Sequence, residues 1–444
     1  MLNHTRWRPG AVALAGVLVA LFLGTAAGAG RYSVVVLEEL QPAAISNTGY
    51  VAGNVVSDVT PVKAVVRRPD GALTEIVGQG VPGRDAELAV ATGVNDAGDV
   101  VGHYRPRPWD GISLHPFVFR GGVFHDLSGQ LGTSTHANGI NNAGAIVGMR
   151  RVFGQERAYV LRPDGVLIDL GPGNARAVSD TGYVVGNTEE RDTSRLPFVF
   201  REANGNGVSD PGELIRLGTL GQRSNAARGV NDAGQVVGCV EDAIPANHAV
   251  IWSAPAPGAP PVELAARALP NACANAINNR GQIVGFYQDG AFLFENGRAK
   301  DLKTLIRAAG GGGPEVEPRN AIAINQGGSL VATAGPTPQA RMGVLLLAPV
   351  TPALDALTVS PNAARAGSRV TVAVRLTIRP PRPLAIPVTV TRDGQPQRLR
   401  LTVQVRGTSG AKRVWLPRRL EAGTYTLSAT LGGATRTATL TVSP

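Results

Sequence analysis

The sequence predicts an all-β protein, in which a seven-bladed β-propeller closed by an N-terminal strand is followed by an Ig-like β-sandwich. Three observations support this prediction. A nine-residue pattern recurs seven times, further strand-like segments follow each copy, and residues 356–444 alternate apolar and polar residues without the pattern. The composition agrees, because 43% of the 444 residues are hydrophobic, only 17% are charged, and Gly (56) and Pro (32) are frequent. Such a chain is not a coiled coil, a helical bundle or a polytopic membrane protein.

Residues 1–29 have the features of a secretory signal peptide. Arg6 and Arg8 precede an apolar stretch, 11–23, and Ala27-Gly28-Ala29 fits a cleavage site. The apolar stretch is shorter than the roughly 20 residues that a transmembrane helix needs. We therefore expect a secreted protein, extracellular or periplasmic, with an uncleaved N-terminal anchor as the alternative. No later segment is long and apolar enough to predict a membrane span.

The nine-residue pattern predicts a tight hairpin. Ile or Val leads into Asn or Ser, then a second polar residue, a small or polar residue and Gly, and a Val/Ile-rich strand follows. Asn and Asp favour turns because their side chains bond nearby backbone amides, and Gly supplies the positive φ that closes the turn. The turn glycines are 38 to 52 residues apart. The copies are ISNTGYVAG (45–53), VNDAGDVVG (94–102), INNAGAIVG (140–148), VSDTGYVVG (178–186), VNDAGQVVG (230–238), INNRGQIVG (277–285) and INQGGSLVA (324–332).

Each unit supplies further strands beside its hairpin. An aromatic or aliphatic segment follows the hairpin, and a shorter, less regular one comes next, which makes four strands per unit. Seven such units over 30–350 predict a propeller. The last unit lacks a fourth strand after Leu347, and 32–40 is a spare strand that would complete it and hide a sheet edge. An open β-solenoid is the alternative.

The hairpin and the segment after it resemble a known family. The third strands begin with His115-Pro116-Phe117 in one unit and with His248-Ala249-Val250 in another. Together with the hairpin pattern they make residues 31–348 resemble the bacterial extracellular HAF-repeat proteins. The resemblance implies an exported, propeller-like repeat protein, and it implies no catalytic residues.

Residues 351–355 form a short linker, and 356–444 are a module of different character. Seven short alternating strands separated by turn residues are typical of an Ig-like β-sandwich. The segment GTYTLSATLGG (423–433) resembles the late strands of bacterial Ig-like modules. Such modules act as spacers or adhesive units.

The two cysteines, Cys239 and Cys273, are candidates for a disulfide. An exported chain meets an oxidising environment, where a bridge can form and persist. Two buried free thiols are the alternative, because spacing alone does not bring two Cα atoms within bridging distance.

One loop follows the calcium-loop template, in which oxygen ligands occupy positions 1, 3, 5, 7, 9 and 12 and Gly occupies position 6. Position 1 is Glu where Asp is usual, and the loop lies between two predicted strands rather than two helices. A polar, Gly-rich hairpin insertion is the alternative to calcium (Ca2+). The predicted ligands are Glu202, Asn204, Asn206, Val208, Asp210 and Glu213, with Gly207 at the turn.

A second candidate site lies near the predicted central channel. The position two residues before the leading Ile or Val varies while its neighbours repeat. In four units it is Asn138, Arg176, Arg228 or Asn275, which would offer donors to an anionic or sugar-like ligand. The alternative is that these side chains face the surface between strands. The repeated turn Asn residues are explained by the turn itself. The six histidines match no compact metal motif, and we interpret them as hydrogen-bonded or exposed.

The sequence predicts an exported, non-enzymatic binding or surface-interaction scaffold. Its net charge of +10 comes from scattered residues with no basic run of five and no interleaved aromatics, so we expect no nucleic-acid partner. No nucleophile elbow, phosphate loop or zinc-protease motif is visible. We expect a monomer that binds an extracellular glycan or protein. A propeller hydrolase or lyase acting on extracellular polysaccharide is the alternative, and a purely structural envelope role is a third.

Overall fold

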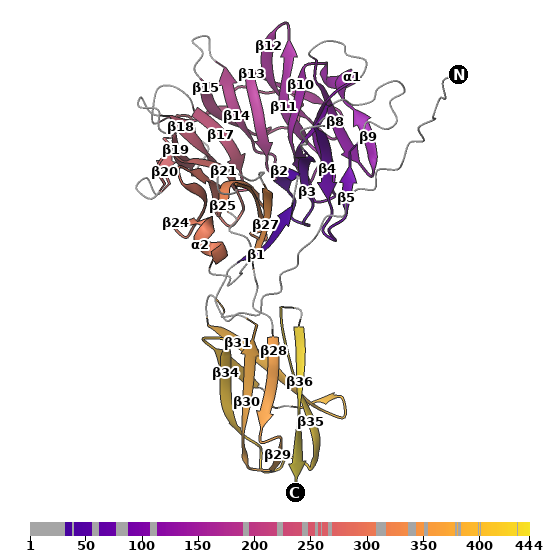
Figure 1. Ribbon diagram of the computed structural model, residues 1–444, viewed down its shortest axis with the longest axis vertical. Coiled ribbons are helices and arrows are strands. Elements are labelled where there is room, and N and C mark those ends of the chain that lie inside the picture. The colour runs from indigo at the N-terminus through magenta and orange to yellow at the C-terminus, as the bar shows by residue number, and fades with distance from the viewer. Residues whose placement is uncertain are drawn as a thin grey trace, which may run out of the picture. The chain divides into compact units, whose positions relative to one another are not determined.

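The computed structural model divides the chain into two compact units (Figure 1). The main parts of the first are Val34–Thr304 with Gly313–Ala348, and the main part of the second is Pro349–Pro444. The predicted signal peptide, 1–29, lies outside the described residues. The structure describes residues 32–37, 40–55, 62–76, 88–106, 113–189, 195–219, 225–241, 247–253, 256–258, 260–264, 269–307, 317–335, 343–349, 354–377, 380, 383–397, 399, 401–432 and 434–444.

The seven predicted hairpins are present in the first unit, and each joins the first and second strands of a repeat. The same two backbone hydrogen bonds close every turn, as in Asn95 N–H to Asp99 O (3.1 Å) and Gly98 N–H to Asn95 O (3.0 Å). The first strands are β2 (Leu40–Ile45), β6 (Leu88–Val94), β10 (Thr135–Ile140), β13 (Leu167–Val178), β17 (Asn225–Val230), β21 (Cys273–Ile277) and β25 (Glu317–Ile324). The second strands are β3 (Val51–Val55), β7 (Val100–Arg105), β11 (Ile146–Val152), β14 (Val184–Glu189), β18 (Val236–Glu241), β22 (Ile283–Tyr287) and β26 (Leu330–Gly335).

Outer strands extend each hairpin into a small antiparallel sheet, and two short helices, α1 (Ser128–Leu131) and α2 (Leu302–Arg307), follow fourth strands. The third strands are β4 (Lys63–Arg67), β8 (His115–Arg120), β12 (Gln155–Leu161), β15 (Arg195–Phe200), β19 (Asn247–Trp252), β23 (Gly290–Glu295) and β27 (Gly343–Pro349). The shorter fourth strands are β5 (Leu73–Glu75), β9 (Val123–Asp126), β16 (Leu214–Arg216), β20 (Val262–Glu263) and β24 (Arg298–Asp301).

The sheets are not seven separate four-stranded blades. β13 is a continuous strand whose first half pairs with β12 and whose second half pairs with β14. It therefore joins two repeats into one seven-stranded sheet, β10-β11-β12-β13-β14-β15-β16, beside five four-stranded sheets. The reason is the short spacing of 38 residues between Gly144 and Gly182, which leaves no loop between the fourth strand of one repeat and the first strand of the next. The prediction of a closed seven-bladed propeller is therefore wrong, and its all-β class is confirmed.

The N-terminal strand β1 (Tyr32–Leu37) lies beside β27 in the sheet order β1-β27-β26-β25. Along the chain, each first strand packs against the first strand of the next repeat, and β25 packs against β2. Between the sheets lie clusters of buried Val, Ala and aromatic side chains, such as Val100, Phe117 and Phe124. These separate clusters pack neighbouring sheets of the repeat unit against one another.

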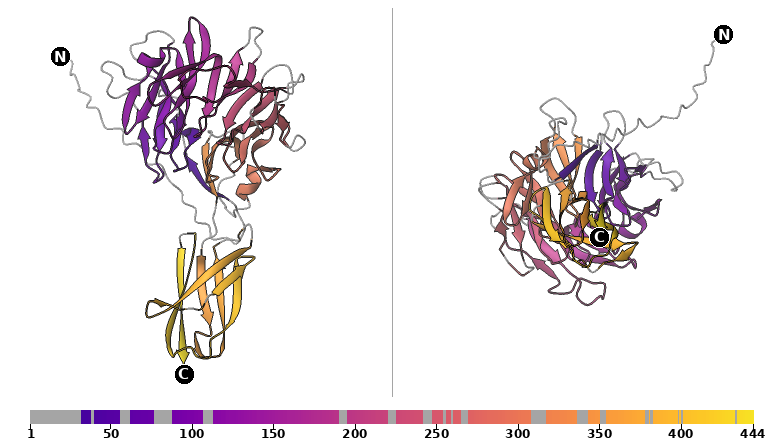
Figure 2. Two further views of the ribbon diagram at one scale, coloured as in Figure 1. Left: turned by 180° about the vertical axis from the view of Figure 1, so that it is seen from behind. Right: turned by 90° about the horizontal axis from the view of Figure 1, so that it is seen from below.

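The second unit is an Ig-like β-sandwich, as the sequence predicts (Figure 2). One sheet has the order β28-β30-β34, and the other has the order β29-β36-β35-β31-β32 with β33 also paired to β31. Tyr425 Oη donates to Glu421 O (2.9 Å), a tyrosine corner of the kind found in Ig-like folds. The strands are β28 (Leu354–Ser360), β29 (Ala363–Arg365), β30 (Arg369–Leu376), β31 (Leu384–Arg392), β32 (Gln395–Pro396), β33 (Leu401–Val405), β34 (Ser409–Trp415), β35 (Gly423–Leu431) and β36 (Ala434–Ser443).

Candidate functional site

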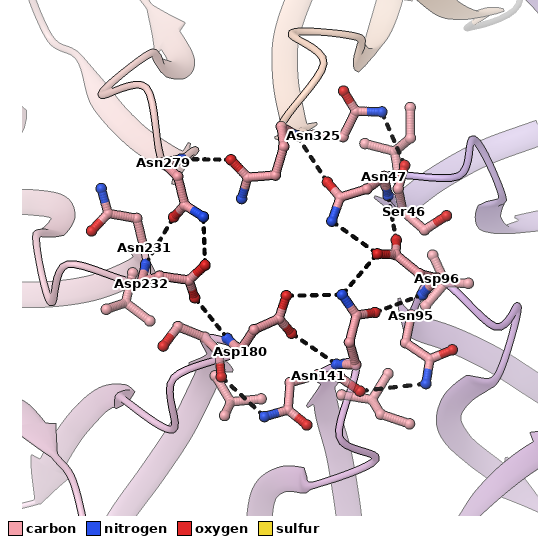
Figure 3. A pocket seen from close by; sticks show the side chains of 18 of the residues that line it. Ser46, Asn47, Asn95, Asp96, Asn141, Asp180, Asn231, Asp232, Asn279 and Asn325 are labelled. Carbon is pink, nitrogen blue, oxygen red and sulfur yellow. Dashed lines mark hydrogen bonds between the residues drawn. The ribbon is translucent and has the colours of Figure 1, made fainter.

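The second polar residue of each turn links its repeat to the next one (Figure 3). Its backbone N–H donates to the side-chain oxygen of the equivalent residue in the following repeat, and the last repeat donates to the first. The seven bonds are Asn47 to Asp96 (2.6 Å), Asp96 to Asn142 (2.8 Å), Asn142 to Asp180 (2.8 Å), Asp180 to Asp232 (2.9 Å), Asp232 to Asn279 (2.9 Å), Asn279 to Gln326 (2.7 Å) and Gln326 to Asn47 (2.9 Å).

The first polar residue of each turn forms an inner layer of bonds. In Asn278, which is fully buried, Oδ1 accepts from the N–H groups of Arg280 and Gln282, and Nδ2 donates to Asn325 O (2.9 Å) in the next repeat. Where Ser replaces Asn, a Thr two residues later makes the link, as in Thr48 Oγ1 to Asp96 O (2.8 Å). The repeated polar residues thus build the turns, as predicted, and they also bind neighbouring repeats together. The remaining Asn links are Asn95 to Asn141 O, Asn141 to Ser179 O, Asn231 to Asn278 O and Asn325 to Ser46 O.

These turns enclose a pocket of about 150 Å³ (Figure 3). Three aspartates line it, Asp96, Asp180 and Asp232, and every one of their carboxylate oxygens accepts a hydrogen bond from the turn network. Among the described residues no group of three or more His, Cys, Asp or Glu side chains is placed to hold a metal ion. We therefore assign these carboxylates to the linkage between repeats.

A β-bulge occurs at the same position in all seven first strands. The pairing register shifts there, so the bulged residue has no partner in the second strand, and such residues are turned out of the ladder. The bulged residue is the one that varies from repeat to repeat in the sequence, and each is at least partly exposed. The seven are Ala43, Thr92, Asn138, Arg176, Arg228, Asn275 and Ile322.

Two of the four predicted ligand-binding residues donate hydrogen bonds from their side-chain amides to the next repeat. Asn138 Nδ2 donates to Asn174 Oδ1 (2.6 Å) and to Ala175 O (2.7 Å) of the next repeat. Asn275 makes the equivalent pair of bonds to the following repeat, with Nδ2–O distances of 2.7 and 2.8 Å. These donors are already satisfied by the protein.

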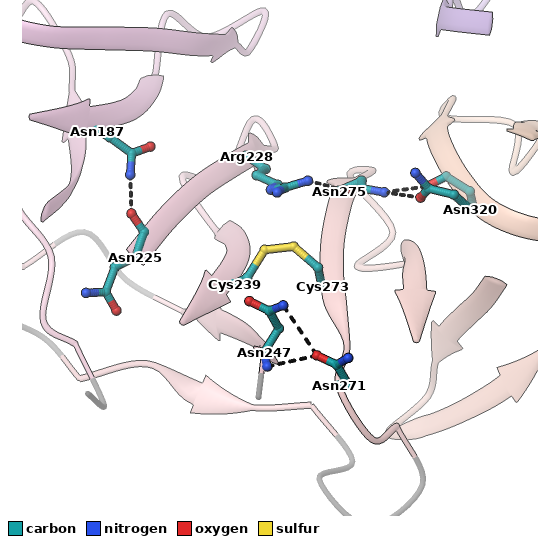
Figure 4. Close-up of a disulfide and its surroundings, with 10 residues drawn as sticks. Asn187, Asn225, Arg228, Cys239, Asn247, Asn271, Cys273, Asn275 and Asn320 are labelled. Atoms are coloured by element: carbon teal, nitrogen blue, oxygen red, sulfur yellow. Dashed lines mark hydrogen bonds between the residues drawn. A yellow bond between two sulfur atoms is a disulfide. The ribbon is translucent and has the colours of Figure 1, made fainter. Parts of the chain in front are cut away.

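Unlike the two Asn side chains, the side chains of Arg176 and Arg228 have hydrogen-bonding groups or charge that the described protein leaves unpaired. Arg228 Nη1 donates to Asn275 Oδ1 (2.9 Å), whereas its buried Nε has no acceptor among the residues that the structure describes (Figure 4). Burial lowers the pKa of Arg228, and the positive charge of Arg176 lowers it further. Burial also lowers the pKa of Arg176, followed by the charge of Arg195. Within the described chain neither Arg176 nor Arg228 has a carboxylate partner, so together they form a positive site without a counter-charge.

The disulfide Cys239–Cys273 lies beside this site (Figure 4). It joins β18 of one repeat to β21 of the next, with the two Cα atoms 4.9 Å apart. Cys273 is two residues before Asn275, and Cys239 pairs with Ala226, two residues before Arg228. The bridge therefore fixes β21, which carries Asn275, to β18, the strand that pairs with the Arg228-bearing strand β17.

The calcium-loop residues lie between β15 and β16 and do come together. Asn204 and Asn206 both donate through Nδ2 to Asp210 Oδ2 (2.7 Å each), and Glu213 accepts from the N–H groups of Ala203 and Asp210. Glu202 accepts from Gly207 N–H (2.6 Å), and Val208 is exposed. The calcium site remains a prediction.

Arg162, from outside the loop, also binds it. Its Nη1 is 3.2 Å from Glu202 Oε1 and 3.2 Å from Gly205 O. A guanidinium thus neutralises the carboxylate at the first predicted ligand position, and sequence spacing gave no sign of this contact.

Two of the histidines meet across neighbouring repeats. The rings of His103 and His136 lie 4.5 Å apart. Burial, followed by the charge of His136, lowers the pKa of His103 to about 4. His248 instead bonds Glu263 Oε1 (2.7 Å). The sequence does not predict the contact between His103 and His136, because these residues are 33 positions apart and belong to different sheets.

Comparison with known proteins adds little. No protein-family model matches the chain, and no curated protein matches it. Solved structures that match include the N-terminal four Ig domains of Dscam1 isoform 8.4, at 12% identity over 93% of this chain and 99% of that one, with a TM-score of 0.19. A chimeric titin Z1Z2 carrying a decorin peptide matches at 17% identity over 49% and 93%, with a TM-score of 0.15. Such low scores support no argument about this chain. None of the helices in its described part has the length and apolar character of a membrane span.

Proposed function

We propose that this chain is an exported, non-enzymatic binding protein, and that its repeat unit presents Arg176 and Arg228 to an anionic group of an extracellular glycan or protein. Export is supported by the signal-peptide pattern of 1–29 and by the resemblance to exported HAF-repeat proteins. The observation that carries the proposal is the pair of arginines on adjacent first strands, which lack a carboxylate among the described residues and include a buried, unbonded Nε.

The surroundings suit a preorganised site. The turn bonds, the inner Asn bonds and the disulfide hold the neighbouring first strands at fixed separations. A ligand would therefore find the guanidinium of Arg228 already oriented by Asn275. Preorganisation lowers the entropic cost of binding, and a guanidinium binds carboxylate, sulfate or phosphate oxygens through two parallel N–H groups.

The test is a glycan array that compares carboxylated and sulfated oligosaccharides with their neutral counterparts. We expect the chain to retain acidic members, and Arg176→Ala/Arg228→Ala to bind them about tenfold to a hundredfold more weakly, as expected when one or two charge-assisted bonds are lost. Arg68→Ala/Arg298→Ala removes the same charge from exposed positions and is the control. Equal affinity of the Arg176/Arg228 variant and the wild type would reject the site.

The same oligosaccharides separate binding from turnover. Incubation with the chain followed by mass spectrometry should return them unchanged. Shortened or unsaturated products would favour the alternative prediction of a polysaccharide hydrolase or lyase.

A further inference from the structure

The charge of the chain is concentrated in the Ig-like module. Residues 354–444 contain fourteen Arg or Lys and three Asp or Glu, a formal charge of +11. The preceding 353 residues contain twenty-nine basic and thirty acidic residues and are almost neutral. Strong charge asymmetry between two parts of a chain points to a charged partner for one of them. The scattered arginines of the whole sequence conceal this asymmetry.

Several of these cations share one face. In β30 the residues Val370, Val372 and Val374 are buried in the sandwich core, so the alternate residues face outward. On this outer face of the β28-β30-β34 sheet, Arg369 pairs with Trp415 and Thr371 pairs with Arg413. The face is otherwise flat, since the other outward residues of β30 and β34, apart from Arg375, are small.

The side chain of Trp415 is unusually exposed to solvent for a residue of its size. It is 66% exposed, and it is the only exposed large hydrophobic residue in the described part of this module. The guanidinium of Arg369 lies 5.5 Å from its ring centroid. Arg418 and Arg419 follow in an exposed turn, and the side chain of Arg418 lies beside Gly367, close to the start of β30.

The module has no acids left to neutralise this face. Asp355 pairs with Arg375, and both Glu421 and Asp393 pair with Arg392. In the described part of the chain, no carboxylate forms an ion pair with the cations around Trp415. These cations are Arg369, Arg413, Arg418 and Arg419.

We propose that the outer face of the β28-β30-β34 sheet binds an acidic polysaccharide. Carboxylate or sulfate groups along the polymer would pair with Arg369, Arg413 and the cations of the following turn. A sugar ring between them would lie on the open face of Trp415. The flat sheet suits an extended polymer, because it offers a row of charges and no closed pocket.

The same observations disfavour three other polyanionic partners: single-stranded nucleic acid, duplex nucleic acid and a lipid surface. Single-stranded nucleic acid is held by several aromatic side chains on which successive bases stack, and this face offers one. A duplex is read by a helix or ribbon that enters a groove, and a flat sheet face does not do so. A lipid surface is bound by an apolar segment that inserts beside basic residues, whereas Trp415 stands alone among Arg, Thr and Ala.

The experiment measures binding of the full chain to immobilised polygalacturonate at about 50, 150 and 500 mM NaCl, with dextran as the neutral control. We expect binding to polygalacturonate and not to dextran, weakening with salt. Arg369→Ala/Arg413→Ala should weaken binding at least about tenfold, and Trp415→Ala several-fold. Arg369→Lys/Arg413→Lys should keep part of the affinity. Circular dichroism confirms that each variant is folded.

Two controls make the result specific. Arg365→Ala/Arg406→Ala removes the same charge from exposed positions outside this sheet and should change affinity less than about threefold. Equal losses for both pairs would mean nonspecific attraction and would overturn the proposal. The second control repeats the measurement in a chain that already carries Arg176→Ala/Arg228→Ala. Adding Arg369→Ala/Arg413→Ala to that chain should lower its remaining polygalacturonate affinity at least about tenfold, so this face is tested without the arginine site of the repeat unit.

Competition identifies the polymer class. Soluble polygalacturonate should displace the chain at lower concentrations than oligo(dT), and vesicles containing phosphatidylserine should not retain it. Tighter binding to oligo(dT) or to the vesicles, or no binding to polygalacturonate at about 50 mM NaCl, would overturn the proposal.

Discussion

At the scale of single residues, steric exclusion of a side chain explains why six of the seven copies of the nine-residue pattern end in Gly. A Cβ added to Gly238 would lie 1.8 Å from Ala226 O, and equivalent glycines in other repeats have similar clashes. The bulge in the facing first strand brings this carbonyl close. The seventh repeat has Ala332 instead, and its first strand has a second register shift, between Pro318 and Asn320.

Gly238→Ala should therefore destabilise the repeat unit strongly. We expect a loss of at least about 2 kcal/mol in the free energy of unfolding, because strand backbone must move to admit the methyl group. Gly129→Ala, where a Cβ would meet nothing within 4 Å, is the control and should be close to neutral. Urea denaturation of both variants measures the difference. A Gly238→Ala variant as stable as Gly129→Ala would contradict the steric argument.

The bond between the inner turn layers of neighbouring repeats is made by Asn in most turns and by Thr where Ser replaces Asn. This difference allows a second test at this scale. Asn278→Ser removes the side-chain donor that reaches Asn325 O, and should cost about 1 to 3 kcal/mol. Adding Arg280→Thr recreates the Ser-x-Thr arrangement of the repeat that contains Ser179 and Thr181, in which Thr bonds the next repeat.

The double variant should recover part of that loss, and a double-mutant cycle in urea measures the coupling. Arg280→Thr alone is the control. Simple additivity of the two substitutions would show that the Thr does not make the inter-repeat bond.

At the scale of elements, the contact between His103 and His136 makes stability depend on pH. The pKa of His103 is about 4 in the folded protein, below its value in an unfolded chain, so protonation favours unfolding. The stability linked to His103 is complete above about pH 6.5 and falls as the pH approaches 4. Burial lowers the pKa of His136 in the same direction, with Glu156 opposing the shift and Arg151 adding to it.

His103→Gln should reduce the loss of stability between pH 7 and pH 4.5 by about 2 kcal/mol, measured by urea denaturation at each pH. Carboxylate titration contributes to the same range, so the wild type and the variant are compared at each pH. Parallel curves for the two proteins would show that His103 is not responsible.

The loop between β15 and β16 gives a metal prediction at this scale. If Glu202, Asp210 and Glu213 bind Ca2+, about 1 mM CaCl2 should raise the melting temperature, and Glu213→Gln should remove the increase. Arg162→Ala should enlarge it, because the guanidinium competes for Glu202. MgCl2 is the control salt. An unchanged melting temperature at about 10 mM CaCl2 would reject the calcium loop.

At the scale of the whole molecule, the N-terminal strand joins the two ends of the repeat unit. β1 lies beside β27, and its Tyr32 and Leu37 are buried. Removing 32–37 would expose the edge of β27 and the apolar surface that these side chains cover. Unpaired sheet edges are sites of association.

We expect a chain that begins at Leu40 to melt at a lower temperature and to form oligomers in size-exclusion chromatography. The chain that begins at Arg31 is the control and should stay monomeric. Equal melting temperatures and elution volumes would show that β1 is dispensable.

Much of this arrangement followed from local patterns. The hairpins, the alternating strands of the second unit and the varying position that proves to be a bulge all depend on a few neighbouring residues. The separation of the sheets was predicted incorrectly, because the continuity of β13 depends on the absence of a loop. The sequence pattern does not distinguish the four predicted ligand residues, yet Asn138 and Asn275 bond neighbouring repeats while Arg176 has no carboxylate partner among the described residues.

The sequence by itself determined the all-β class, the seven turns and the Ig-like module, because turn closure and strand alternation are set by residues close together in the chain. Only the tertiary structure decided which repeats share a sheet, that Cys239 meets Cys273, and that the surplus cations of the second unit gather around Trp415. These features depend on contacts between residues far apart in sequence, and their distances are fixed only when the sheets pack.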